Sequence, residues 1–128
     1  MPPAQASRWI LASGGALMCA ATVLGALGAH ALQGRLSPDR LHVYDTAVRY
    51  HFYHSLGLLA IGLAVRAGAG SLARWSAGLV LLGVVLFSGS LYVLCFGAPR
   101  AIGVVTPIGG LALIAGWLMF AVAMLRGG

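Results

Sequence analysis

The chain of 128 residues is 60% hydrophobic and only 8% charged, and its mean hydropathy is +0.94. This composition excludes an ordinary soluble domain, in which about a quarter of the residues are charged. All eight basic residues are arginine, two residues are acidic, and the formal net charge is +6. Because the arginines flank apolar runs, we expect membrane lipids as partners and no nucleic acid.

Four long uncharged runs lie between the arginines. A bilayer core of roughly 30 Å needs about 20 apolar residues per helical span, and the runs hold 26, 16, 25 and 25 residues. We predict an all-α integral membrane four-helix bundle, a single domain over residues 1–128, with a short interfacial amphipathic segment before the second span. The expected spans are about 9–32, 49–67, 74–96 and 106–126, and the interfacial segment is 37–48.

The first span begins at an interface marked by Arg8 and Trp9. Its apolar run of about 20 residues is longer than the 7 to 15 of a signal-peptide core, so we expect a retained span. Two sets of small residues repeat at four-residue intervals, which lets helix backbones approach closely. The first set is Ala12, Ala16 and Ala20, and the second is Ala21, Gly25 and Ala29. We expect these sets to pack helices within the chain, and we also expect self-association.

The second helix has a clear start, since Ser37 can cap it and Pro38 fits the first helical position. A helix that continues to Arg66 measures about 43 Å at 1.5 Å per residue, which exceeds a bilayer core. Its first part therefore lies along the interface or projects from it. The uncharged run after Arg49 covers only about 24 Å, which places this arginine near the hydrocarbon edge.

Two faces of the second helix differ in chemistry at 100° per residue. The first face presents His42, Asp45, Arg49, Phe52, Tyr53 and Leu56, and the second presents Ala47, Tyr50, His51 and His54. Asp45 and Arg49 have the spacing of an ion pair. His54 points away from Arg49, so the two cannot form one site on this helix alone. Ionisable groups at this depth are candidates for function, and the alternative is a neutral histidine bonded to a neighbouring helix.

The third and fourth spans also carry polar groups. Ser88, Ser90 and Tyr92 can form hydrogen bonds across helices in lipid. Thr106 as a cap and Pro107 as the first helical residue predict the start of the fourth helix. Residues 101–105 are then expected to form an interfacial or re-entrant piece.

The cysteines and the motif content give no sign of catalysis. Cys19 and Cys95 are expected at different depths, where they act as small apolar residues and form no disulfide. The sequence has no Cys-x-x-Cys motif and no glycine-rich phosphate loop. We therefore expect no metal, no cofactor, no catalytic residue and no enzyme activity.

Four ordered motifs, GALGAHAL (25–32), TAVRYHFYHSL (46–56), LFSGSLYVL (86–94) and GVVTPIGGLALIAGW (103–117), resemble the small four-span bacterial inner-membrane proteins of the YgdD/YwdK type. That family is a domain of unknown function with small eukaryotic transmembrane relatives. The resemblance covers roughly residues 10–122 and implies four membrane helices without an established activity. By this resemblance, His30 matches the histidine of a GAHGL-like motif, and Arg49 and His54 match those of VRYQFYH. His51 stands where a glutamine is usual.

We predict a non-enzymatic accessory protein of the bacterial inner membrane, with a polar cluster at one membrane face that binds a lipid, a quinone or a partner subunit. The cluster comprises His30, Asp45, Arg49, Tyr53, His54 and Thr106. One alternative is an oligomeric small transporter or channel subunit with a proton relay and a broken helix at Thr106. The others are a haem protein and a lipid-modifying enzyme.

Orientation depends on the arginines, which number four on each side of the predicted bundle. If Arg49 lies inside the membrane edge, it no longer counts. The positive-inside rule then places both termini in the cytoplasm.

Overall fold

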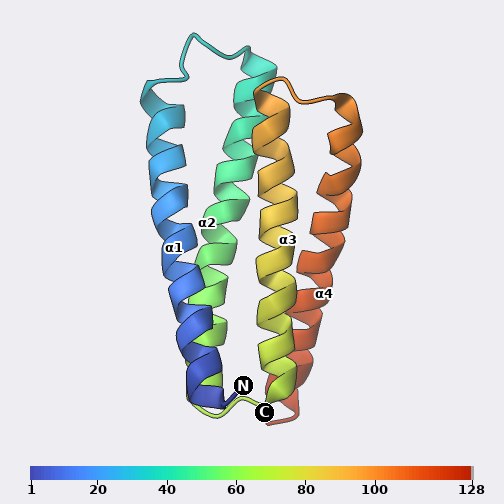
Figure 1. The fold of residues 1–128 in the computed structure, drawn as a ribbon. Coiled ribbons are helices and arrows are strands. Elements are labelled where there is room, and N and C mark those ends of the chain that lie inside the picture. Colours follow the sequence, from blue (N-terminus) through green and yellow to red (C-terminus); the bar gives the residue numbers. More distant parts are fainter. Residues whose placement is uncertain (128) are drawn as a thin grey trace.

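The computed structural model describes residues 1–127, and all the regular structure in this range is helical. The helices are α1 (Pro3–His30), α2 (Pro38–Arg66), α3 (Ser71–Cys95) and α4 (Val105–Leu125), and a 3₁₀ helix, η1 (Arg100–Val104), leads into α4. Successive helices run in opposite directions, so the two termini lie at the same end of the molecule (Figure 1). We call this the terminal end, and we call the other one the loop end.

The helices pack in chain order. Extensive contacts join α1 to α2, α2 to α3 and α3 to α4, whereas α1 touches α3 only slightly. The central pair is therefore α2 and α3, and α1 and α4 flank it on either side (Figure 1). The predicted set of four helices is confirmed, and one hydrophobic core cluster contains residues from all four of them.

The start of α2 follows the sequence prediction. The Ser37 hydroxyl accepts a hydrogen bond from the Arg40 amide at 3.3 Å, and Pro38 is the first helical residue. The helix then continues without a break to Arg66. A separate interfacial segment at 37–48 is not confirmed, because these residues form the first turns of α2. Tyr44 and Ala47 are buried in those turns.

The start of α4 differs from the prediction. Val104, and not Thr106, is the residue that precedes the helix, and no side chain caps it. The Thr106 hydroxyl instead lies 2.5 Å from that of Ser90 on α3. A partner on another helix thus replaces the expected local cap, and residues 100–104 form η1.

Glycines set the distance between α3 and α4. A Cβ added to Gly83 would lie 2.7 Å from Leu113, and one added to Gly116 would lie 2.8 Å from Val80. At Gly109 the added atom would overlap the backbone of Phe87. Close backbone approach of this kind is a main source of helix association in lipid.

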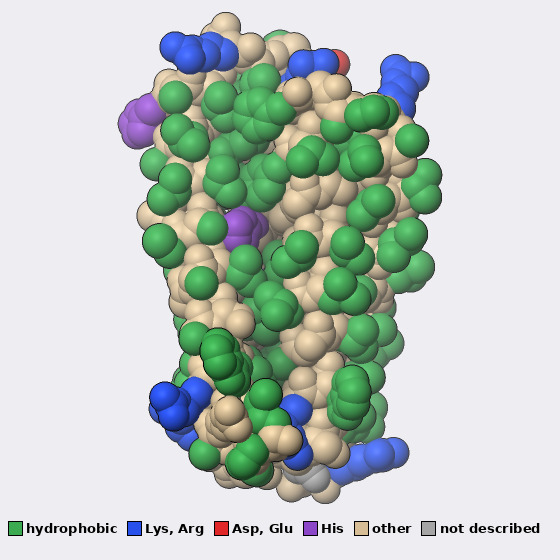
Figure 2. All heavy atoms as spheres, in the orientation of Figure 1, with side chains coloured by type: hydrophobic (Ala, Val, Ile, Leu, Met, Phe, Trp, Pro, Cys, Tyr) green, Lys and Arg blue, Asp and Glu red, His purple; other side chains and the backbone are tan. Residues whose placement is uncertain are grey.

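Three stretches are long and apolar enough to cross a membrane by length and composition: α1, α3, and Arg100–Leu125. Figure 2 shows the matching surface, with arginines at the two ends and hydrophobic side chains between them. The helix outside this set is α2, which carries all the acidic residues and three of the four histidines.

Candidate functional site

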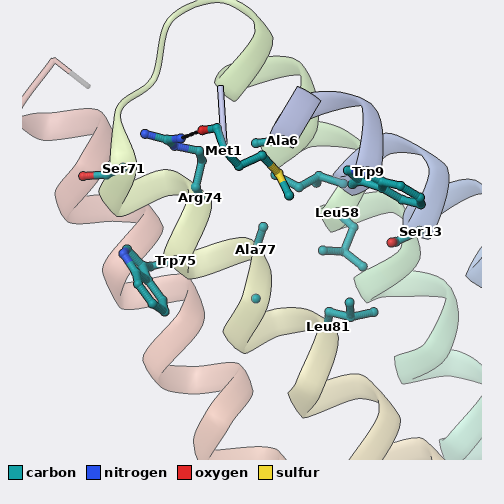
Figure 3. Close-up of a pocket in the computed structure, with 12 residues that line it drawn as sticks. Met1, Ala6, Trp9, Ser13, Leu58, Ser71, Arg74, Trp75, Ala77 and Leu81 are labelled. Atoms are coloured by element: carbon teal, nitrogen blue, oxygen red, sulfur yellow. Dashed lines mark hydrogen bonds between the residues drawn. The ribbon is translucent and has the colours of Figure 1, made fainter. Parts of the chain in front are cut away.

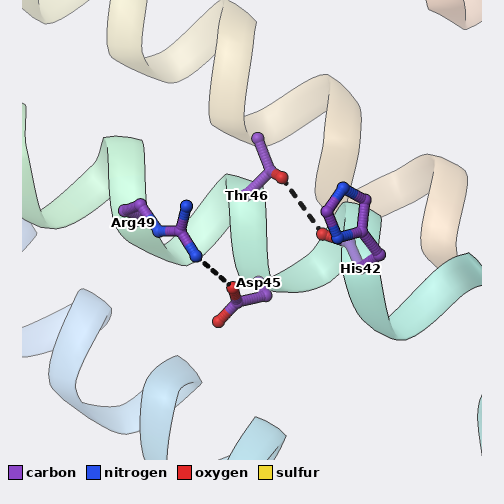
Figure 4. Close-up of polar contacts among 4 residues, drawn as sticks. All are labelled: His42, Asp45, Thr46 and Arg49. Atoms are coloured by element: carbon purple, nitrogen blue, oxygen red, sulfur yellow. Dashed lines mark hydrogen bonds and ion pairs between the residues drawn. The ribbon is translucent and has the colours of Figure 1, made fainter. Parts of the chain in front are cut away.

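The predicted ion pair of α2 is present at the loop end (Figure 4). The Arg49 guanidinium donates to the Asp45 carboxylate over 2.7 Å, and the side chains are 56% and 64% exposed. One turn earlier, the Thr46 hydroxyl donates to the backbone carbonyl of His42. A pocket of about 410 Å³ between α1 and α2 reaches this group, with His42 and Asp45 in its wall.

Three of the four residues named on the other face of α2 are buried, and the fourth, Tyr50, is 39% exposed. His51 is 5% exposed and His54 is 8% exposed, and Ala47 is fully enclosed. His51 faces α3, where its Nδ1 lies 2.9 Å from the Tyr92 hydroxyl. Within residues 1–127 its Nε2 is the only enclosed side-chain nitrogen or oxygen without a hydrogen-bond partner.

Three side chains of α3 bond to α2, and we call this contact the polar seam. Ser88 donates to the carbonyl of Ala47 at 2.8 Å, Tyr92 bonds to His51, and the Cys95 thiol donates to the carbonyl of Arg40 at 3.3 Å. Positions 88, 92 and 95 fall on one face of a helix, which lets all three act together.

Tyr44 continues the polar seam to α1. Its hydroxyl donates to the carbonyl of Leu24, and its ring meets the ring of Tyr92 edge-on at 5.5 Å. The close approach of α1 depends on Gly28, where an added Cβ would lie 2.6 Å from the Tyr44 ring.

His54 lies on the side of α2 that faces α4. Its Nδ1 is 2.7 Å from the carbonyl of Tyr50, and because a carbonyl can only accept, Nδ1 carries the proton. In the neutral ring Nε2 is then an acceptor. The imidazole is stacked near the Tyr50 ring at 6.0 Å, and the Trp117 ring of α4 lies 6.1 Å away.

Beside His54 is a pocket of about 540 Å³ between α2, α3 and α4, which we call the lateral pocket. Four of the eight residues that line it have an aromatic ring. The lining residues are Tyr50, His54, Phe87, Gly110, Leu113, Ile114, Trp117 and Leu118. Ile114 and Leu118 are 59% and 64% exposed, so the pocket opens on the apolar flank of the molecule.

The six residues predicted as a site do not form one cluster, and they are spread from the loop end, where His30 lies, to the middle of α2, where Tyr53 and His54 lie. Asp45 pairs with Arg49, and both Tyr53 and His54 contact Tyr50. His30 is exposed at the end of α1, and Thr106 is engaged with Ser90. The structure does not place His30 opposite His54, the pair that a haem between facing helices requires.

Tyr44 and Trp117 were not predicted as part of a site, and Cys95 was predicted only as a small apolar residue, whereas its thiol donates to the carbonyl of Arg40. The signal for the polar seam was the repeat of polar residues at 88, 92 and 95, which matches one helical face. No comparable signal existed for Trp117, because its partners Gly57 and His54 lie on a helix distant in sequence.

Comparison with known proteins identifies the protein family. Residues 24–110 match the family described as "Protein of unknown function (DUF423)". UPF0382 membrane protein SH2409 of Staphylococcus haemolyticus is 48% identical over 103 residues, which cover 80% of this chain and 83% of the relative. UPF0382 membrane protein SERP0230 of Staphylococcus epidermidis is 43% identical over 91% of this chain and 93% of its own length.

The Bacillus subtilis UPF0382 membrane protein YwdK is 43% identical over 80% of this chain and 85% of the relative. No solved structure matches the chain. The relatives' names and the three apolar helices agree that this is a membrane protein, and the predicted resemblance to the YwdK type is confirmed. The chain belongs to the DUF423 family of uncharacterised membrane proteins.

Proposed function

We propose that the protein is a non-enzymatic membrane component that binds a lipid-soluble hydroxylated aromatic molecule, of the quinol type, in the lateral pocket. The observation that carries this proposal is the position of His54, a histidine of known tautomer in the wall of an aromatic pocket. Pockets of 300–1,000 Å³ with apolar walls and a few placed polar groups are typical of small-molecule sites.

The hydrogen bond of His54 selects the class of ligand. With its proton held on Nδ1 by Tyr50, the neutral ring offers a lone pair on Nε2. A ligand hydroxyl can donate to that lone pair, whereas a carbonyl or an ether cannot. The reduced, hydroxylated form of a quinone therefore fits this nitrogen better than the oxidised form.

The walls of the lateral pocket favour a flat aromatic head group. Tyr50, Phe87 and Trp117 supply ring faces and edges, and such pairs contribute about 0.5–1.5 kcal/mol beyond area burial. The exposed Ile114 and Leu118 form the side toward lipid, where an apolar tail can extend. Arg49 and Tyr53 lie beside the pocket on α2. Tyr53 does not line the pocket, but its ring contacts that of Tyr50, which does.

The direct test is binding of a short-chain hydroquinone to the purified protein, with two variants that alter the pocket differently. His54→Phe keeps a ring between Tyr50 and Trp117 but removes the acceptor, and we expect affinity to fall roughly two- to tenfold for one lost hydrogen bond. Gly110→Leu fills the pocket. A Cβ at Gly110 makes ordinary contact with Phe87 at 3.8 Å, so we expect this variant to fold and lose saturable binding.

The matched control is Gly89→Leu on α3. An added Cβ at Gly89 meets nothing within 4 Å, and this residue is not among those lining the pocket. The control should bind as the wild type does. Equal affinity in wild type, His54→Phe and Gly110→Leu would reject the proposal.

We further propose that α2 is a fourth span, in a bacterial plasma membrane. Two candidate spans, α1 and α3, run in the same direction, and α2 connects them while packed along both (Figure 1). A helix that returns the chain between two parallel spans must itself cross. Helical bundles belong to plasma membranes, since outer membranes use β-barrels.

For orientation we propose that both termini are cytoplasmic. The terminal end carries Arg8, Arg66, Arg74 and Arg126, whereas Arg49, one of the four arginines of the loop half, stands about three turns into α2, at the expected membrane edge, where it no longer counts. The positive-inside rule then favours the terminal end as the cytoplasmic one. A carboxy-terminal reporter that is active only outside the cytoplasm should stay silent, and activity there would reverse the assignment.

Self-association is proposed through the outward surface of α1. Ala21 and Gly25 of the second set of small residues face α2, but Ala12 and Ala16 of the first set are exposed. Close packing of such residues drives helix pairing in lipid. Ala16→Leu should weaken cross-linking between copies in bilayers, and the absence of any cross-linked species in the wild type would remove the idea.

A second candidate function, movement of protons by a small transport subunit, is favoured by His51. Its Nε2 is enclosed and has no hydrogen-bond partner while Nδ1 bonds to Tyr92, so an imidazole with one uncommitted nitrogen is buried within the helices. Proton leak into vesicles that contain the protein should exceed that of empty vesicles and fall in His51→Phe. Equal leak in the two vesicle types would exclude it.

A further inference from the structure

A second recess lies at the terminal end, away from the lateral pocket. It is a groove of about 550 Å³ between α1 and α3, which we call the terminal groove. It exists because both helices pack on α2 but scarcely touch each other. Leu58 of α2 is one of its lining residues, together with small side chains such as Ala6 of α1 and Ala77 of α3.

One end of the terminal groove is charged and aromatic. Arg74, Trp9 and Trp75 all line it, and Figure 3 shows Arg74 beside Met1, with Trp9 across from them and Leu58 and Leu81 further along. Trp9 and Trp75 are 62% and 72% exposed. Tryptophan and arginine side by side at the end of apolar helices are typical of the head-group level of a bilayer.

Arg74 has hydrogen-bonding capacity to spare. Its Nη1 donates to the backbone carbonyl of Met1 at 2.8 Å, and a guanidinium has five N–H donors. Phosphate is a favoured partner for the guanidinium N–H groups that Met1 does not occupy, because they lie in one plane and can bind two oxygens at once.

The charges of the terminal end suit an anionic partner. Arg8, Arg66 and Arg126 lie at this end with Arg74, and both acidic residues of the chain, Asp39 and Asp45, lie in the first turns of α2 at the loop end. The terminal end is thus basic without compensation by any carboxylate side chain. A ligand with a negative head group and an apolar chain matches this groove. The head group suits the end at Arg74, and the chain suits the apolar remainder.

We propose that the terminal groove is a binding site for an anionic phospholipid, with the phosphate on Arg74 and one acyl chain along the groove between α1 and α3. The bound lipid fills the space that the missing α1–α3 contact leaves. This site is separate from the lateral pocket, and it holds or fails independently of the quinol proposal.

Gly78 allows the groove to be blocked without a clash. It lines the groove, and a Cβ added there meets nothing within 4 Å. Gly78→Leu therefore occupies the path of the acyl chain while the helices keep their positions. The matched control is Gly89→Leu on the same helix, which has equal free space but is not a lining residue of the groove.

The experiment measures tryptophan quenching in bilayers that contain phosphatidylglycerol or phosphatidylcholine with brominated acyl chains. Trp9 and Trp75 are two of the three tryptophans and report on the terminal groove. The wild type should prefer the anionic lipid by about fivefold or more, the effect of one arginine near an anionic surface. Arg74→Gln should remove about fivefold of that preference, and Gly78→Leu should reduce quenching by either lipid.

A second control separates a site from a general surface field. Arg126→Gln removes the same charge at the same end, but Arg126 is not a lining residue of the groove. It should keep most of the preference, as should Gly89→Leu. Equal losses in Arg74→Gln and Arg126→Gln, or unchanged quenching in Gly78→Leu, would overturn the proposal. Arg74→Gln decides the matter if Gly78→Leu fails to fold, because it leaves the helix contacts of the core intact.

Discussion

The α3–α4 contact and the α2–α3 contact hold neighbouring helices together by different means. Between α3 and α4, Gly83, Gly109 and Gly116 bring the backbones close. Between α2 and α3, the polar seam of Ser88, Tyr92 and Cys95 reaches backbone carbonyls and His51. Lipid gives no hydrophobic drive for helix pairing, so association depends on close packing and hydrogen bonds. On the α4 side of α3 close packing dominates and the Ser90–Thr106 hydrogen bond adds to it, whereas on the α2 side hydrogen bonds dominate.

The two contacts also differ in the polar side chains that they hold. In the α3–α4 contact the hydroxyls of Ser90 and Thr106 bond to each other, whereas the contacts of α2 bury two histidines. Of these, His51 is committed to Tyr92, and His54 borders the lateral pocket. The buried histidines are therefore all on α2, and α3 and α4 provide the other walls of the lateral pocket.

The largest effect is expected from Gly109→Ala. A single added methyl group overlaps the backbone of Phe87, which cannot move aside as a side chain can. Overpacking of this kind costs roughly 1–3 kcal/mol, and we expect a matching loss in the free energy of unfolding in detergent. Gly89→Ala, in open space on α3, should be neutral or slightly stabilising. If the two variants unfold alike, close packing does not hold α4 in place.

The next largest effect is expected from Tyr92→Phe. It leaves both ring nitrogens of the buried His51 without a partner, a loss of about 1–3 kcal/mol for an unsatisfied buried group. A double-mutant cycle with His51→Phe isolates the pair. The double variant should be more stable than the sum of the single losses predicts, and strict additivity would show that the two side chains act independently.

Ser88→Ala should cost less. The carbonyl of Ala47 is part of the α2 backbone and keeps its place in the helical hydrogen-bond pattern. Only the one hydrogen bond between α2 and α3 is lost. Such bonds in membrane proteins contribute about 0.6 kcal/mol on average. A loss as large as that of Tyr92→Phe would mean that Ser88 carries more of the polar seam than its geometry indicates.

The smallest effect is expected from Asp45→Asn. The pair with Arg49 is more than half exposed, and exposed ion pairs contribute about 0.2–1 kcal/mol or less. The change in unfolding free energy should be near the lower limit and should shrink further in high salt. Asp39→Asn, which removes the other carboxylate, is the control. A loss above the range for exposed pairs would give this pair a structural role in α2.

The sequence predicted the elements of the fold better than their arrangement. The Ser37–Pro38 start and the Asp45–Arg49 pair are confirmed, because both depend on neighbours within one helix. The pairing of the helices was not predictable, since the uncharged runs fix the number of helices and not which pairs pack together. The cap assigned to Thr106 was wrong because its hydroxyl bonds to Ser90 on α3.

The candidate site was predictable only in part. The helical wheel placed His51 and His54 on the face opposite Arg49, and those histidines are the buried ones. The wheel could not tell that His51 faces α3 while His54 faces α4, because that depends on the packing order. Trp117, which also lines the lateral pocket, could not be predicted as a pocket residue for the same reason.

The central claim is that Nε2 of His54 accepts a hydrogen bond from a ligand in the lateral pocket. The most direct measurement compares a short-chain hydroquinone with its dimethyl ether, which has the same ring but no hydroxyl to donate. Both are titrated against the fluorescence of Trp117 in a variant that carries Trp9→Phe and Trp75→Phe. We predict saturable quenching by the hydroquinone, weaker binding of the ether, and no difference between them in His54→Phe. Equal binding of the two compounds, or quenching that rises without saturation, would contradict the claim.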